Sequence, residues 1–176
     1  MLLRCLKNAV IGSNRQKATV FSEGVVPRLK QLLRDPSVPI HIKTEATVTL
    51  GSLAKGTDDH VQALVDNGIV PILLSGKFSI IQTYDLFPSI EQLYLFKISK
   101  SVKPLIYVSG ITSTDTRLSE VSLRCLCTIF QSQTPPVEVI YMDQGLIPVL
   151  LELTSRSITN QICVTTILAA SCKVRP

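Results

Sequence analysis

The chain is poor in aromatic residues and in histidine. Its 176 residues include no tryptophan, four tyrosines, five phenylalanines and two histidines. Long helices rich in leucine, valine and isoleucine can fill a core without aromatic rings, so the shortage is compatible with a helical domain. His41 and His60 fall in separate predicted loops, and neither has a cysteine or carboxylate at metal-ligand spacing. We therefore expect no metal site.

Long hydrophobic runs are also missing. The longest uncharged stretch, residues 157–172, is too short and too polar to span a membrane. The first five residues, Met-Leu-Leu-Arg-Cys, place an arginine inside the apolar start, and no small-residue cleavage site follows. This start is a poor signal peptide.

The cysteines indicate a reduced protein. Their number is odd and all fall on apolar helical patterns: Cys5, Cys125, Cys127, Cys163 and Cys172. Reduced core cysteines of an intracellular protein explain this better than disulfides do. Cys5 and Cys125 occupy the same repeat position, which predicts a packing role.

The net charge of +5 does not form a block. The basic residues are scattered along the chain and have no aromatic residues between them. Solvated helix faces explain this pattern better than a nucleic-acid interface does.

Three stretches share one order: glycine, two apolar residues, then proline. They run from Gly24 to Pro27, Gly68 to Pro71 and Gly145 to Pro148. Glycine accepts a positive φ where a helix must stop and restart, and proline three residues later suits the first turn of the next helix. Gly24 and Gly68 are 44 residues apart, inside the range of ~40–47 expected for armadillo and HEAT repeats.

A second landmark keeps the same register. Leu6, Leu50 and Leu126 lie 18, 18 and 19 residues before the next corner glycine. Apolar spacing and turn residues predict helices over 1–11, 15–23, 26–34, 42–54, 59–66, 117–131, 137–143, 147–154 and 161–172. The expected interior residues are Ala18, Phe21, Leu29, Leu32, Leu33, Ala46, Leu50 and Leu53.

These patterns predict an all-α protein, an armadillo-type α-solenoid of about two and a half repeats. Terminal repeats normally carry a polar outer face, and neither end of this chain does. We therefore expect an uncapped fragment or a truncated isoform.

An insert interrupts the second repeat. From Gly24 to the matched helix start at Thr44 there are 20 steps, and from Gly68 to Glu120 there are 52. The surplus, about 32 residues, falls within 77–110, between repeat segments 1–76 and 111–176. This segment holds six of the nine aromatic residues. We interpret it as a retained intron or an annotation artefact, the alternative being an evolved recognition loop.

The stretch from Leu6-Lys-Asn-Ala-Val10 to Leu33 resembles an armadillo repeat: a Leu-x-Asn helix end, a first helix, then Gly-apolar-apolar-Pro and a second helix. More narrowly, residues 3–12, 43–54 and 123–130 resemble the N-terminal repeats of the armadillo scaffold subunits of CTLH (GID-type) E3 ubiquitin ligases. The resemblance implies a non-catalytic, cytoplasmic and nuclear scaffold that docks a substrate receptor. It implies partners that are protein subunits of the ligase, and no cofactor, nucleic acid, membrane or small-molecule substrate.

The resemblance also implies a binding face. Armadillo proteins hold partners along the concave side formed by successive third helices. The family's asparagine position falls at Asn8, Ser52 and Thr128, and the position one turn earlier at Arg4, Val48 and Arg124. Only Asn8 keeps an amide able to hold a peptide backbone through both its donor and its acceptor.

Other interpretations remain open. The chain could be an importin- or catenin-like peptide-binding module, or an unrecognised enzyme, and each of these six residues could be an ordinary exposed helix position. No serine, cysteine or carboxylate stands in a recognisable nucleophile constellation. Cys125 and Cys127 point to opposite sides of a helix, which makes them a poor metal pair.

Overall fold

A computed structural model describes residues 2–74, 110–142 and 146–173. Within these ranges every regular element is a helix, which confirms the all-α prediction. The helices are α1 (Leu2–Val10), α2 (Asn14–Ser22), α3 (Val25–Arg34), α4 (Ile40–Ala54), α5 (Asp58–Asp66), α6 (Ile69–Leu74), α8 (Thr116–Phe130), α9 (Glu138–Met142), α10 (Leu146–Thr154) and α11 (Ile158–Lys173). None of the helices in these ranges is both long and apolar enough to cross a membrane.

The predicted corners have the expected backbone. Gly24 and Gly68 both have φ of +66°, in the left-handed region, and each leads directly into α3 or α6. A Cβ on Gly24 would meet nothing within 4 Å, so the backbone angle alone requires glycine there. Pro27 and Pro71 are the third residues of their helices, as Pro148 is of α10. Gly145 lies outside the described residues.

Side chains cap the first helix of two repeats in the same way. Ser13 caps α2, and its backbone N–H donates to Oε1 of Gln16 at 2.8 Å. Thr57 caps α5, and its N–H donates to Nδ1 of His60 at 3.2 Å. His60 therefore belongs to a helix and not to a loop, and His41 lies in α4. The loop prediction was wrong for both histidines, and for His60 it conflicted with the helix predicted over 59–66. His60 is the third helical residue of a capping box, and His41 is the second residue of α4.

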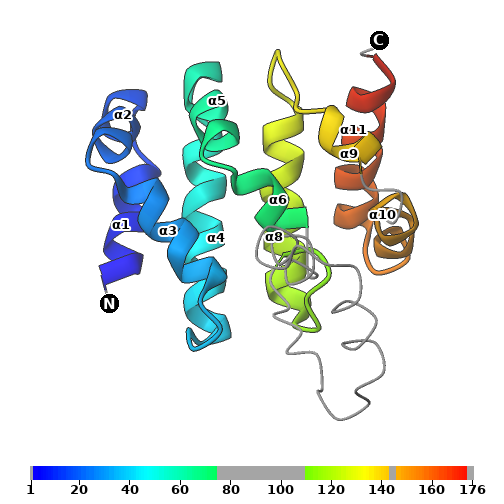
Figure 1. The fold of residues 1–176 in the computed structure, drawn as a ribbon, viewed down its shortest axis with the longest axis horizontal. Helices are drawn as coiled ribbons and strands as arrows, with labels where there is room; N and C mark the ends of the chain where they lie inside the picture. The colour runs from blue at the N-terminus through cyan, green and yellow to red at the C-terminus, as the bar shows by residue number, and fades with distance from the viewer. Residues whose placement is uncertain (1, 75–109, 143–145, 174–176) are drawn as a thin grey trace, which may run out of the picture.

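The helices stack as an armadillo-type solenoid. α1, α4, α8 and α11 stand side by side in one row, with α4 packed between α1 and α8, and α8 between α4 and α11 (Figure 1). The shorter helices form a second layer, which gives the trios α2–α3–α4, α5–α6–α8 and α9–α10–α11. In this layer α2 and α5 pack on the preceding third helices, α1 and α4, whereas α3, α6 and α10 pack on the third helix of their own trio (Figure 1). Each trio makes one repeat, and α1 takes the place of a third helix.

The core lies between the two layers. Leu29, Leu50 and Leu53 are at most 1 % exposed, and Leu33 and Ala46 are also buried, as predicted. Phe21 and Leu32 were also predicted to lie in the interior, but they are only half-buried. The prediction for Ala18 was wrong, since it lies on the exposed side of α2.

The cysteines divide between core and surface. Cys125, Cys127 and Cys163 are buried, whereas Cys5 and Cys172 are exposed, so the packing role predicted for Cys5 was wrong. Cys125 packs on Gly51 of α4, and Cys127 contacts Cys163 of α11, which confirms that they face opposite sides of α8. Burial raises the pKa of Cys163 to about 11 and that of Cys125 to about 12.

Gly110 and Ile111 lie against the end of α6. The Ile111 N–H donates to the carbonyl oxygen of Leu73 at 2.9 Å. Gly110, with φ of +92°, lies so close to the end of α6 that an added Cβ would collide with the Leu73 carbonyl. The rest of the predicted insert, 77–109, lies outside the described residues, so its interpretation as a retained intron stays a prediction.

Candidate protein-binding face

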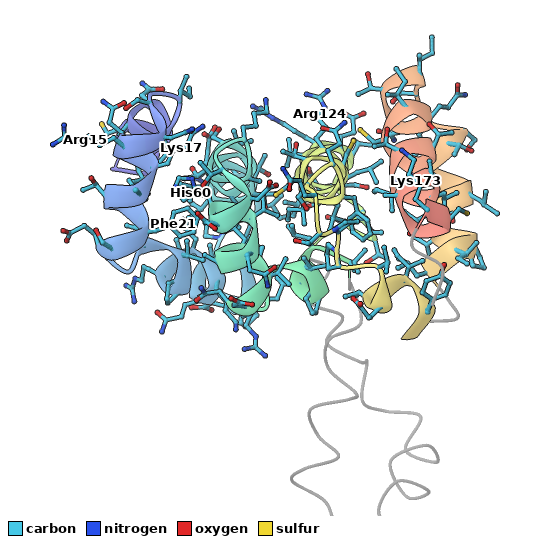
Figure 2. All side chains as sticks on the ribbon, turned by 90° about the horizontal axis from the view of Figure 1, so that it is seen from above. Arg15, Lys17, Phe21, His60, Arg124 and Lys173 are labelled. Carbon is cyan, nitrogen blue, oxygen red and sulfur yellow. The ribbon has the colours of Figure 1, made fainter. Side chains whose placement is uncertain are left out.

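The candidate binding residues lie on the row of third helices. Asn8 is on α1, Val48 and Ser52 are on α4, and Arg124 and Thr128 are on α8. Arg4 also belongs to α1, but its side chain is outside the described residues. In Figure 2, the Arg124 side chain points away from the ribbons on this side of the molecule.

The two hydroxyls of the asparagine position bond to their own helices. Ser52 Oγ donates to the Val48 carbonyl at 3.1 Å, and Thr128 Oγ1 donates to the Arg124 carbonyl at 3.0 Å. The donor of each hydroxyl is thus occupied, while its lone pairs can still accept a hydrogen bond. These positions can receive a partner's N–H groups, but they do not offer the two-sided pairing of an amide.

Of the described side chains in this set, Asn8 and Arg124 are exposed. Asn8 presents an amide donor and an acceptor, whereas the Arg124 guanidinium presents only donors and keeps its positive charge. Arg124 also lies near Cys163, and its positive charge lowers the pKa of that thiol. Burial raises the same pKa by more, so the pKa of Cys163 stays raised.

Helical spacing extends the face beyond the predicted pairs. The additional side chains at the same angular position are exposed or half-buried: His41 and Glu45 on α4 with Lys55 at its C-cap, and Arg117 and Val121 on α8 with Gln131 at its C-cap. Together with the predicted pairs on α4 and α8 they form what we call the third-helix face. It has three cations, Lys55, Arg117 and Arg124, and one carboxylate, that of Glu45, so it favours acidic partners.

The sequence analysis missed the last repeat's contribution. Asp115 caps α8 through its side chain, and Ser157 accepts from the Asn160 N–H at the start of α11. Aligning these caps places Thr166 and Ala170 at the positions of Arg124 and Thr128. Both are half-buried, and Thr166 Oγ1 donates to the Ile162 carbonyl at 2.8 Å. Ser157, the capping residue at the start of α11, is the sequence feature that could have placed Thr166 and Ala170 at these positions.

The ranges described contain no candidate metal site. There, no group of three or more histidine, cysteine, aspartate or glutamate side chains comes together as metal ligands.

Comparison with known proteins assigns the class. Residues 13–55 match the Armadillo/beta-catenin-like repeat, and this segment comprises α2, α3 and α4. The crystal structure of an engineered protein superposes with a TM-score of 0.66 at 23 % identity, over 97 % of this chain and 55 % of that one. Together with the stacked helices, these findings define an armadillo-type α-solenoid protein.

The chain also resembles particular armadillo proteins. The chain is 38 % identical over 168 residues to Armadillo repeat-containing protein 8 of Xenopus laevis, and 36 % identical to that of Danio rerio. The matches cover 96 % of this chain but 19 % and 20 % of those relatives. The resemblance to armadillo repeat proteins inferred from sequence is thereby confirmed, and the chain spans about a fifth of the length of these relatives.

Proposed function

We propose that the chain is a non-catalytic scaffold that binds protein subunits of a CTLH (GID-type) E3 ubiquitin ligase and docks its substrate receptor. The observation that carries this proposal is the third-helix face. It presents exposed arginines and lysine beside small side chains on adjacent helices, a surface suited to an extended protein segment. The similarity to armadillo repeat-containing protein 8 supports a scaffold role.

The partner surface should be acidic or rich in backbone and amide groups. Arg124 is exposed at the centre of the face, and its planar guanidinium can bind a carboxylate through two parallel hydrogen bonds. Ser52 and Thr128 accept further hydrogen bonds beside it. A basic peptide of the importin-bound kind would meet repulsion from Arg124, so this alternative is less well supported.

The test is a pull-down of purified ligase subunits by the tagged chain, with affinity measured for each retained subunit. We expect Arg124→Glu to weaken binding about tenfold, which corresponds to about 1.4 kcal/mol. Arg28→Glu is the matched control, because Arg28 is equally an exposed helical arginine but lies on α3, in the other layer.

Three outcomes would decide between the alternatives. Binding of the subunits by the parent chain and by Arg28→Glu, with loss in Arg124→Glu, supports the proposed face. Binding of a basic signal peptide and of no ligase subunit would favour the importin- or catenin-like module. A folded chain that retains neither would contradict the scaffold proposal.

A deletion of residues 77–109 belongs in the same experiment. Leu73 and Ile111 are already hydrogen bonded, so we expect the shortened chain to fold and to keep its partners. Loss of binding with retained helical content would instead support an evolved recognition loop. Imaging the tagged chain in cells would test our expectation of a cytoplasmic and nuclear protein.

A further inference from the structure

The connection between α8 and α9 (Figure 1) contains a threonine followed by two prolines. α8 ends at Phe130 and α9 begins at Glu138, so residues 131–137 belong to neither helix. Thr134 is exposed, and Pro135 directly after it is half-buried. In the complete sequence, Thr134-Pro135 is the one place where a serine or threonine precedes proline. This single pair therefore lies in an irregular segment with its hydroxyl residue at the surface.

The backbone at Thr134 suits the substrate groove of a protein kinase. A residue before proline is restricted to extended conformations, and the described residues contain no cis peptide bond. Proline-directed kinases accept a threonine followed by proline, which has no N–H that would be buried without an acceptor. α9 has five residues, and helices this short are marginally stable on their own. We therefore expect the segment to open locally when a kinase binds it.

A contact between two repeats lies beside Thr134. The Gln133 N–H donates to Oδ1 of Asp58 at 3.3 Å. Asp58 is the first residue of α5, and Asp59 follows it in the same helical turn. This hydrogen bond joins the connection between α8 and α9 to the start of α5, where two carboxylates already lie close together.

We propose that Thr134 is a phosphorylation site of a proline-directed kinase, and that its phosphate loosens the contact between Gln133 and Asp58. Thr134 Oγ1 attacks the γ-phosphorus of Mg²⁺-bound ATP, the bond from that phosphorus to the β–γ bridging oxygen breaks, and ADP leaves. The hydroxyl proton passes to the catalytic aspartate of the kinase. Phosphothreonine carries about −1.5 to −2 charges at pH 7. One residue away from the Asp58 contact, this charge repels the carboxylates at the start of α5.

Phosphate transfer to the folded chain tests the site. The full chain is incubated with MgATP and a purified proline-directed kinase, and the modified residue is located by peptide mass spectrometry. We expect the phosphate on Thr134 and no transfer to Thr134→Ala. Pro135→Ala keeps the hydroxyl and should lower the initial rate about tenfold. Thr114→Ala is the matched control at another exposed threonine, followed by Asp115 instead of proline, and it should leave the rate unchanged.

Hydrogen exchange measured by mass spectrometry tests the consequence. Phosphorylation should speed the exchange of residues 131–137 and of the first turn of α5. Asp58→Asn removes the carboxylate charge but keeps an oxygen that can accept from Gln133, so phosphorylation should change its exchange less. Asp66→Asn, at the other end of α5, is the matched control and should respond to phosphorylation as the parent chain does.

Two results would overturn the proposal. One is a folded chain that accepts no phosphate although the same kinase phosphorylates a synthetic peptide of residues 128–140. The other is a chain phosphorylated on Thr134 whose hydrogen exchange equals that of the unmodified chain. No ligase subunit takes part in either measurement, so both results are independent of the scaffold proposal.

Discussion

Two contacts between successive repeats of the solenoid differ in chemistry: one joins the shorter helices at the first junction, and the other joins the third helices at the last junction. At the first junction, where α2 and α3 meet α5 and α6, lysine side chains of α2 and α3 bind carbonyls at the C-terminal ends of α4 and α5. Lys17 Nζ donates to the Lys55 carbonyl at 3.2 Å, and Lys30 Nζ donates to the Asn67 carbonyl at 2.7 Å. Phe21 stacks on His60, with ring centroids 4.9 Å apart and planes within 5°.

The hydrogen bonds of the two lysines at the first junction involve the C-terminal ends of two helices. Lys55 and Asn67 are the C-cap residues of α4 and α5, so their carbonyls lack intrahelical partners and lie at the negative ends of the helix dipoles. The two ammonium groups satisfy these carbonyls. Lys17 is buried, with 6 % of its surface exposed, although lysine normally lies at the protein surface.

The last junction, where α8 meets α11, is formed by thiols and aliphatic residues. Cys127 contacts Cys163, and Val164 and Ile167 of α11 are at most 1 % exposed. α8 also contains Ser122, whose Oγ is buried without a hydrogen-bond partner in the described structure. The comparison indicates that the contact between α8 and α11 can form through thiols and aliphatic side chains, whereas the contact at the first junction adds charged hydrogen bonds to helix ends.

Removing a lysine bridge should give the largest effect. Lys30→Met keeps the aliphatic stem but leaves the Asn67 carbonyl without its charged donor. We expect a loss of about 1–2 kcal/mol in the free energy of unfolding, measured by urea denaturation. Lys55→Met is the control: this side chain is exposed, and its removal should cost under about 0.5 kcal/mol. Equal effects of the two changes would contradict the bridging role.

Replacing the unsatisfied serine of α8 should raise the free energy of unfolding, whereas removing a lysine bridge lowers it. Ser122 occupies the position of Ala46 in α4, and both are 0 % exposed. Ser122→Ala should raise the free energy of unfolding by about 1 kcal/mol, since it removes an unpaired buried hydroxyl. Ser119→Ala on the same helix should be destabilising, because Ser119 Oγ donates to the Ile111 carbonyl at 2.7 Å. Thermal denaturation of both variants would show whether the signs differ.

The smallest effect should be a pH dependence confined to the first junction. Burial, and then the nearby charge of Lys17, lower the pKa of His60. The folded state therefore favours neutral imidazole, whose Nδ1 accepts from Thr57. This contribution to stability is complete above the unfolded pKa of about 6.5 and is lost as the pH falls through the lower folded value.

His60→Gln should reduce that dependence. Gln16 already performs the same capping role in α2, so the substitution keeps the cap and removes the titrating group. Urea denaturation at a series of pH values between 5 and 7.5 is the measurement, with His41→Gln as the control at an exposed histidine. An unchanged pH profile in His60→Gln would show that another group controls the acid response.

Much of the candidate binding face could be located from the sequence because the helical register depends on local spacing. The spacing of Leu6, Leu50 and Leu126 from the corner glycines places Asn8, Ser52 and Thr128 on equivalent turns of the third helices. Whether these residues bind a partner stays a prediction. Sequence did not show that Ser52 and Thr128 would direct their hydroxyls to their own helices, because a hydroxyl rotor has several partners within reach.

The sequence by itself determined what depends on neighbours along the chain: the helices, the left-handed corner at Gly24 and Gly68, and the caps at Ser13 and Thr57. These follow from local sterics and hydrogen bonding within a few residues. Only the tertiary structure decided which equivalent positions are buried. Cys5 and Cys125 share one repeat position, yet only Cys125 is buried. Periodicity sets the direction of a side chain, but its burial depends on the helix stacked against it.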